Sequence, residues 1–193
     1  MVKHKSGEVN SIKNTKKMKD LVRQNLSIHV DVMDLLNKQI EKEAHSSSAY
    51  LAMASWCDHN ALSYSADFFY EQAAEEREHM MKIFRFINDN GGTAYSPEVS
   101  GVNHDFKSLE EIFETALDQE IAITKAIHNI VGKCRKLNDY TTEYFLQWFI
   151  AEQMEEEQTM RRALELFDLM GTEGLGLKLL DERIPQIRDK RAE

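Results

Sequence analysis

The sequence predicts an all-α protein, a bundle of four long helices with one long crossover and a short fifth helix at the C-terminal end. Apolar residues recur at three- and four-residue spacing over four long stretches. The chain of 193 residues holds only 2 prolines and 8 glycines, too few turn residues for a fold of many strands. The breaks between the stretches are short, long and short, which is typical of a bundle with one crossover.

The first two helices are expected at residues 30–58 and 63–89. No helix breaker interrupts the first stretch, and Asn90-Gly91-Gly92 ends the second with a C-terminal signal. The core-facing stripe of the first holds Leu36, Ile40, Glu43, Ser47, Tyr50, Ala54 and Cys57. The stripe of the second holds Phe69, Gln72, Glu76, His79, Ile83 and Phe86.

Residues 91–107 have no periodic pattern and are expected to form the crossover. Ser108 and Glu111 then match a capping box at the start of a third helix, which should reach Lys136. Its stripe holds Phe113, Leu117, Glu120, Thr124, Ile127, Val131 and Cys134.

A fourth helix is expected after Asn138 and Asp139, ending at Met170 before a glycine. Its stripe holds Leu146, Phe149, Gln153, Glu156, Met160, Ala163 and Phe167. A short amphipathic helix, 175–184, follows and closes at a proline.

Charge divides the chain into a basic extension and an acidic body. Seven basic and two acidic side chains give residues 1–25 a net charge of +5, which leaves −14 for the rest of a chain whose total is −9. We therefore predict an N-terminal extension at 1–25 and one domain at 26–193. The acidic body argues against a specific nucleic-acid-binding domain and for cation handling, although the basic segment could bind nucleic acid weakly and without specificity.

Two cysteines far apart, Cys57 and Cys134, form neither a disulfide framework nor a metal-ligand pair. They favour a reducing compartment, so a cytoplasmic location is expected. No apolar run approaches the ~20 residues of a membrane span, and no apolar stretch follows the basic N-terminus as in a secretory signal.

Polar residues occupy the middle of every stripe, where a plain bundle would carry leucine. They are Glu43, Glu76, His79, Glu120, Gln153 and Glu156. Burying an unpaired carboxylate costs several kcal/mol, and too few cationic side chains lie on these stripes to pair with them. A bound metal cation is therefore the simplest explanation.

The spacing of these residues repeats. Glu43 precedes Glu76 by 33 residues, as Glu120 precedes Gln153, and each second member begins an i, i+3 polar pair. This pattern gathers ligands from four helices around two metals. Three carboxylates and one imidazole suit iron or manganese, and Glu76 could bridge the two ions. Few ligands per metal leave positions for dioxygen or peroxide, which favours oxidation of Fe(II) with release of the product.

Four segments together resemble the non-haem ferritins of prokaryotes over residues 28–185. They are Glu43 with Tyr50, the run 75–79 (Glu-Glu-Arg-Glu-His), Glu120, and the run 146–157 with Trp148, Glu152, Gln153, Glu155 and Glu156. The resemblance implies a ferritin-like fold.

It also implies roles for individual residues. Glu43, Glu76 and His79 would bind one iron, and Glu76 with Glu120 the other, with Gln153 lining the second position. A third iron site would use Glu75, Glu152, Glu155 and Glu156. Tyr50 would be a redox-active tyrosine beside the metals, and Trp148 a further candidate electron donor.

Two neighbouring families fit less well. A bacterioferritin would repeat Glu-x-x-His on the fourth helix and carry a methionine where Arg77 stands, so no haem is expected. A rubrerythrin would carry a C-terminal Cys-x-x-Cys pair, which this chain lacks.

The predicted function is iron storage with ferroxidase activity: Fe(II) is oxidised by O2 or H2O2 at the di-iron centre and deposited as a ferric mineral. By resemblance the chain would form a shell of 24 subunits. Two alternatives stay open. One is a dimetal bundle enzyme acting on peroxide or an organic substrate, and the other is a shell protein that binds metal without turnover.

Overall fold

The computed structural model describes residue 26 and residues 28–188, and every regular element in that part of the chain is helical. The helices are α2 (Val30–His59), α3 (Ser63–Asp89), α4 (Leu109–Leu137), α5 (Tyr140–Met170) and α6 (Gly174–Arg183), with a 3-10 turn, η1, at Ile184–Gln186. The predicted all-α fold of four long helices and a short fifth is confirmed. The predicted basic extension, 1–25, lies outside the described residues.

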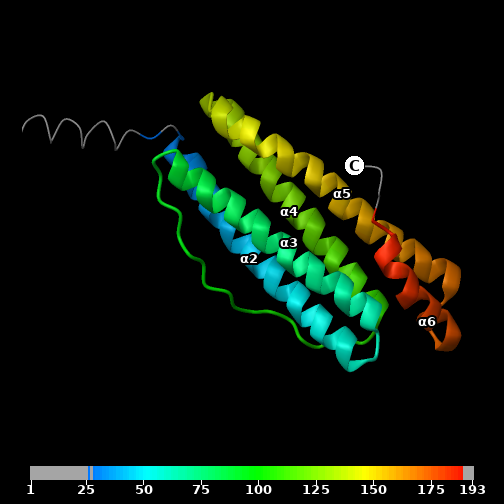
Figure 1. Ribbon diagram of the computed structural model, residues 1–193. Coiled ribbons are helices and arrows are strands. Elements are labelled where there is room, and N and C mark those ends of the chain that lie inside the picture. The colour runs from blue at the N-terminus through cyan, green and yellow to red at the C-terminus, as the bar shows by residue number, and fades with distance from the viewer. Residues whose placement is uncertain (1–25, 27, 189–193) are drawn as a thin grey trace, which may run out of the picture.

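The four long helices form two antiparallel pairs, α2 with α3 and α4 with α5, which lie side by side (Figure 1). Between α3 and α4 the crossover runs back along the length of the bundle, in green in Figure 1. Asn37 of α2 fastens the start of this crossover: its side-chain amide donates to the Thr93 carbonyl at 3.2 Å and accepts from the Tyr95 N–H at 2.9 Å. The side chain of Asn37 therefore holds the backbone of the crossover against α2.

The described helices end within one residue of the predicted bounds, and the capping box before α4 differs in one contact. The Ser108 hydroxyl accepts from the Glu111 N–H at 3.1 Å, as expected for an N-cap. The Glu111 carboxylate, however, accepts from the Lys107 N–H at 2.6 Å, one residue earlier than in a standard capping box. Asn138, at φ 57°, ends α4 in the left-handed conformation that asparagine tolerates.

The core consists of two apolar clusters with a polar layer between them. One cluster, toward the α6 end, contains Phe69, Phe113 and Phe167, and the other contains Leu36 and Ile127 among its members. On α4 and α5 the polar residues Glu120, Gln153 and Glu156 fall between the segments that build these clusters, as Glu76 and His79 do on α3. On α2, Glu43 lies at the edge of the second cluster, next to Ala44. None of the described helices is long and apolar enough to cross a membrane.

α6 packs against the bundle at the end where α3 begins, and a buried aspartate of α6 makes the contact. The Asp181 carboxylate accepts from the Ser65 N–H at 2.8 Å and the Ser65 hydroxyl at 2.6 Å, at the first turn of α3. We expect Asp181→Ala to destabilise the protein by about 1–3 kcal/mol, because buried donors lose their partner. Urea unfolding followed by circular dichroism measures the loss. Glu182→Ala, at an exposed neighbour, is the control, and equal stability of the two variants would contradict this role.

Candidate metal centre

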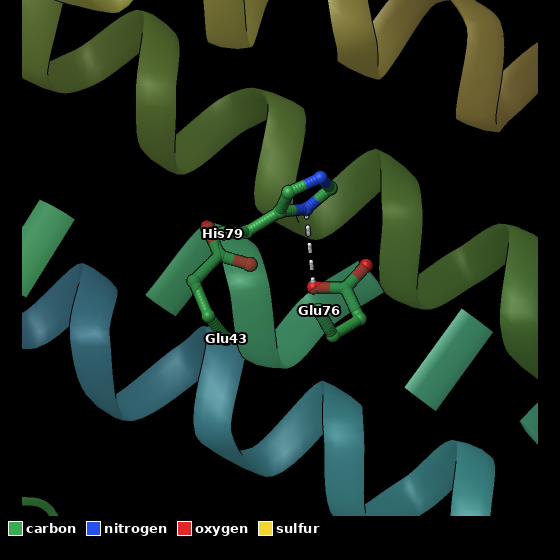
Figure 2. A group of neighbouring side chains, drawn as sticks. All are labelled: Glu43, Glu76 and His79. Carbon is green, nitrogen blue, oxygen red and sulfur yellow. Dashed lines mark ion pairs between the residues drawn. The ribbon is translucent and has the colours of Figure 1, made fainter. Parts of the chain in front are cut away.

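A carboxylate of α2 and a carboxylate and imidazole of α3 meet in the polar layer. Glu43, Glu76 and His79 each offer a ligand atom, and these three atoms lie within 4.8 Å of one another (Figure 2). All three residues are buried, with 1 %, 1 % and 4 % exposure. Glu76 and His79 stand one helical turn apart and so share a face of α3, with His79 Nδ1 3.7 Å from Glu76 Oε2.

Several oxygens of this cluster have no hydrogen-bond donor among the described residues. Glu43 Oε1 accepts from the Gln39 amide at 2.8 Å, but Glu43 Oε2 and both carboxylate oxygens of Glu76 accept none. Leaving buried carboxylate oxygens without a donor is costly. The cost is removed if a metal cation binds there, and the donor set of two carboxylates and one imidazole fits iron.

The electrostatics of the cluster lead to the same expectation. Burial raises the pKa of Glu43 well above its ordinary value, and the neighbouring Glu76 carboxylate raises it further. Burial also raises the pKa of Glu76, with the Glu120 carboxylate as the next cause. A cation between these carboxylates would lower the pKa of both Glu43 and Glu76, because it stabilises their ionised forms.

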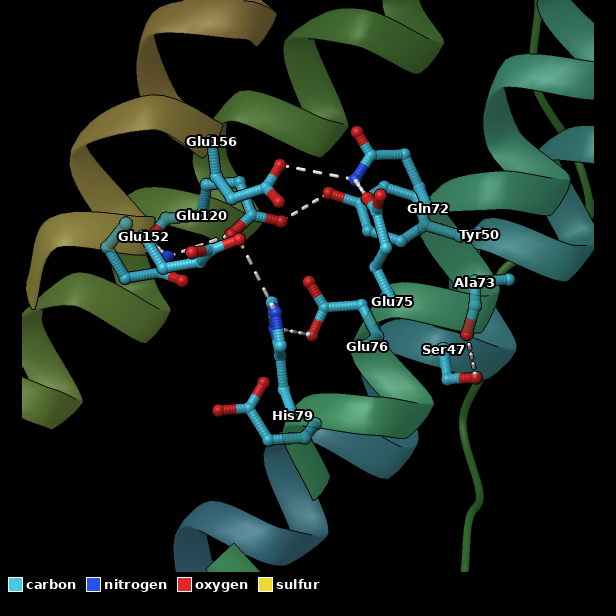
Figure 3. A network of polar contacts seen from close by, with 12 residues as sticks. Ser47, Tyr50, Gln72, Ala73, Glu75, Glu76, His79, Glu120, Glu152 and Glu156 are labelled. Carbon is cyan, nitrogen blue, oxygen red and sulfur yellow. Dashed lines mark hydrogen bonds and ion pairs between the residues drawn. The ribbon is translucent and has the colours of Figure 1, made fainter. Parts of the chain in front are cut away.

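The second half of the layer centres on Glu120 of α4, which is fully buried. Its carboxylate accepts a hydrogen bond from the Tyr50 hydroxyl of α2 (Figure 3). It accepts another, at 2.9 Å, from the Gln153 amide of α5. Burial raises the pKa of Glu120, and the bonds from Tyr50 and Gln153 act against that increase. Side chains from three of the four long helices thus meet at the Glu120 carboxylate, whose position is fixed by two neutral donors.

The four glutamates predicted for a third site are brought together only in part. Gln72 of α3 links two of them, since its amide donates to Glu75 at 3.1 Å and to Glu156 at 3.2 Å. Glu152 is joined to the first cluster, with one oxygen 3.8 Å from His79 Nε2. Glu155 is exposed, and among the described residues its charge helps to raise the pKa of Glu152.

Trp148, the other candidate electron donor, touches the site from its rim. Its ring meets His79 edge-on at 5.3 Å between centroids and is 38 % exposed. The Lys82 ammonium lies 3.4 Å from the Trp148 ring centroid. A cation over an indole face disfavours its one-electron oxidation, because the ring would become positive beside it.

Three residues at the site were absent from the predicted set. The Gln39 amide donates to Glu43, and the Gln72 amide donates to Glu75 and Glu156. Each glutamine lies one helical turn before a predicted ligand. That position on the same helix face was the available signal. Arg188, which binds Glu75, lies beyond the last helix, where no periodic pattern could have indicated it.

Comparison with known proteins agrees with the fold. A family model for the ferritin-like domain matches residues 33–170. The chain belongs to the ferritin-like family. A Haemophilus influenzae protein named as a probable bacterial non-heme ferritin-like protein is 38 % identical over 160 residues, covering 83 % of this chain and 97 % of that protein. A bacterial non-heme ferritin of Campylobacter jejuni is 38 % identical over 157 residues, covering 81 % of this chain and 94 % of its own.

Solved structures give the same relationship. An open pore ferritin from the archaeon Archaeoglobus fulgidus superposes on this ferritin-like chain with a TM-score of 0.79 at 34 % identity, covering 82 % of this chain and 96 % of the other. An engineered closed form of the Archaeoglobus fulgidus ferritin gives 0.78 at 33 % identity, covering 81 % of this chain and 96 % of that one.

Proposed function

We propose that this ferritin-like protein stores iron and has ferroxidase activity, oxidising Fe(II) to Fe(III) with O2 or H2O2. The observation that carries the proposal is the buried cluster of Glu43, Glu76 and His79, whose carboxylate oxygens lack donors in the described part of the chain. The non-heme ferritin relatives support iron as the metal.

In this proposal two Fe(II) ions bind as substrate in the polar layer. One is held by Glu43, Glu76 and His79, and the other lies between Glu76 and Glu120, with Gln153 beside it. Each iron gives up one electron; the pair reduces O2 to H2O2 with two protons, or H2O2 to two waters with two protons. Where one of these two electrons is missing, Tyr50 supplies it in this proposal: its hydroxyl gives its proton to Glu120, and the ring is left as a neutral tyrosyl radical.

The two iron positions have unequal ligand sets, and the weaker set on the Glu120 side favours release of Fe(III) over retention of a fixed cofactor. Gln153 stands where a second carboxylate would close the Glu120 half, and its amide donates to Glu120 at 2.9 Å. A neutral ligand holds Fe(III) less strongly than a carboxylate would. Ferric iron therefore leaves the centre, and we propose that it is deposited as a mineral inside a 24-subunit shell in the cytoplasm.

An oxygenase acting on an organic substrate would need a pocket beside the metals. A surface groove of about 630 Å³ lies along α2 and α3 instead, lined by Ala44, Ser48, Ala73, Met81 and Val99 among others and by none of the proposed ligands. This groove therefore does not place an organic substrate beside the proposed metals.

Anaerobic loading with Fe(II), followed by air, tests the proposal. A storage ferroxidase will show rapid, iron-dependent O2 uptake and will retain iron far beyond two per chain in a particle whose native mass corresponds to many subunits. A dimetal enzyme would stop at two per chain, and a binding protein without turnover would oxidise iron no faster than buffer does.

Tyr50→Phe should change the pH dependence of iron oxidation. Without the Tyr50 hydroxyl, Glu120 loses one of the bonds that oppose the rise in its pKa, so metal binding there must displace a more tightly held proton. We expect the rising limb of the initial-rate profile to move up by about 1 pH unit. Stopped-flow absorbance at pH 5.5 to 8 measures the shift. A profile of unchanged position and lower height would indicate an electron-donor role alone.

A further inference from the structure

The segment after α6 packs against α3 through η1. It brings a cation to the predicted third-site glutamates. Arg188 donates from both terminal nitrogens to Glu75, at 2.7 Å to Oε1 and 2.5 Å to Oε2. It also lies 3.8 Å from Glu71 of the next turn, with its guanidinium 5.5 Å from the centroid of the Phe68 ring. Two parallel bonds to one carboxylate are the strongest geometry available to an arginine.

The backbone beside Arg188 is itself anchored. Ile184 and Ile187 are buried in the apolar cluster at this end of the bundle, with 0 % and 8 % exposure. The Ile187 carbonyl also accepts from the Arg162 guanidinium of α5 at 3.3 Å. The guanidinium is thus presented to α3 by a packed segment, which reduces the conformational entropy lost when the bond to Glu75 forms.

Glu75 is connected to the buried Glu156 through the side chain of Gln72. Gln72 donates to Glu75 and also to the buried Glu156, so the three side chains form one connected group (Figure 3). Burial raises the pKa of Glu156, followed by the charges of Glu120 and Glu75, and the positive charge of Arg188 acts in the opposite direction. Arg188 therefore supplies the compensating positive charge that a metal ion would supply.

We propose that Arg188 is a built-in counter-cation of the Glu75–Glu156 group, and that a divalent metal ion must displace it to bind there. This inference rests on the proposed ferroxidase function and on the third iron site that the family resemblance implies for these glutamates. Both Glu75 oxygens are engaged by Arg188, and one also by Gln72, so a metal can use Glu75 only after the guanidinium moves away. Arg188 would thereby compete with the metal for Glu75 and weaken metal binding at the third position. The Glu43–Glu76–His79 position is unaffected.

Zn(II) titration of the full-length apo protein by isothermal calorimetry tests this without any redox step. Arg188→Gln should strengthen the third Zn(II) equivalent by about tenfold, as expected from removing a competing charged hydrogen-bond pair. The two tighter equivalents should keep their affinity. Arg188→Lys keeps the charge but loses the two-pronged bond, and should fall between the parent and Arg188→Gln.

Two controls separate competition from a general change of charge. Arg183→Gln removes an exposed arginine of the same region that contacts Gln186 rather than Glu75, and should leave the titration unchanged. The double variant Arg188→Gln with Glu75→Gln should lose the gained affinity. Zn(II)-soaked crystals of Arg188→Gln should show an anomalous peak against Glu75.

An unchanged third equivalent in folded Arg188→Gln and Arg188→Lys, or an equal gain in Arg183→Gln, would overturn the inference. Its failure is distinguishable from failure of the proposed function. If the parent binds Zn(II) at Glu43, Glu76 and His79 and oxidises iron rapidly, but Arg188→Gln behaves as the parent, only the role of Arg188 is wrong. If the parent binds no metal in the polar layer, the proposed function fails instead.

Discussion

Glu76→Ala is expected to abolish the fast phase of iron oxidation, lowering its rate by at least ~100-fold, since loss of even an outer-shell partner of a metal ligand costs about 10- to 100-fold. Glu76 is the only residue proposed to contact both irons. It is 1 % exposed, and both of its oxygens lack a hydrogen-bond donor in the described part of the chain. Removing it leaves Glu43 and His79 as ligands for one iron and Glu120 for the other. These ligands are too few to hold two irons together.

Stopped-flow measurement of the Fe(III) absorbance after mixing with O2 gives the rate. The matched control is Glu78→Ala, which removes an exposed glutamate from the same turn of α3 and should oxidise iron as fast as the parent. If Glu76→Ala retained the parent rate, the site assignment would be wrong, whatever the overall iron content of the protein.

The metal-free protein should become more stable when Glu76 loses its charge. We expect Glu76→Gln to raise the free energy of unfolding at pH 7 by about 1–4 kcal/mol, by analogy with the gain when a buried ion pair is replaced by apolar residues of similar volume. The same change should remove most of the stabilisation that the parent gains from a saturating redox-inert metal such as Zn(II). Denaturant unfolding with and without metal measures both effects. A less stable apo variant would contradict the prediction.

The sign of the pH dependence follows from the raised pKa values. Burial lifts the pKa of Glu43 and of Glu76 well above the ordinary 4.5, so at intermediate pH the folded state binds more protons than the unfolded chain does. The stability that these protons contribute is fully present below pH 4.5 and is lost as the pH rises through the folded-state pKa values. The apo parent should therefore lose stability as the pH rises from 4.5 through the folded-state pKa values of Glu43 and Glu76, and Glu76→Gln should flatten that decline. A stability that rises steadily to pH 8 in both proteins would contradict this.

Most of the fold could be predicted because the sequence signals are local. Hydrophobic periodicity and helix-end residues act within one or two turns, so Asn90, Asn138 and Gly171 mark the ends of α3, α4 and α5 where they were expected. The capping box differed by one residue, because Glu111 reaches the Lys107 N–H instead of that of Ser108. Such a choice depends on the path of the preceding loop, which no helical period determines.

The site was less completely predictable, for a physical reason. Glu43, Glu76 and His79 could be grouped because each is a polar residue at an apolar position of its helix, and the structure gathers these three. Whether Gln153 would bind a metal or donate a hydrogen bond could not be read from its position. The contact of Arg188 with Glu75 joins residues 113 apart across an irregular segment, so only the folded chain reveals it.

The most direct test of the di-iron account is a crystal structure of the full-length protein after anaerobic soaking with Fe(II), with anomalous data collected at the iron edge. The account predicts two iron peaks in the polar layer, one in contact with Glu43, Glu76 and His79 and the other between Glu76 and Glu120. Iron found only on the surface, or a single ion that leaves Glu120 bound to Tyr50 and Gln153 alone, would contradict it.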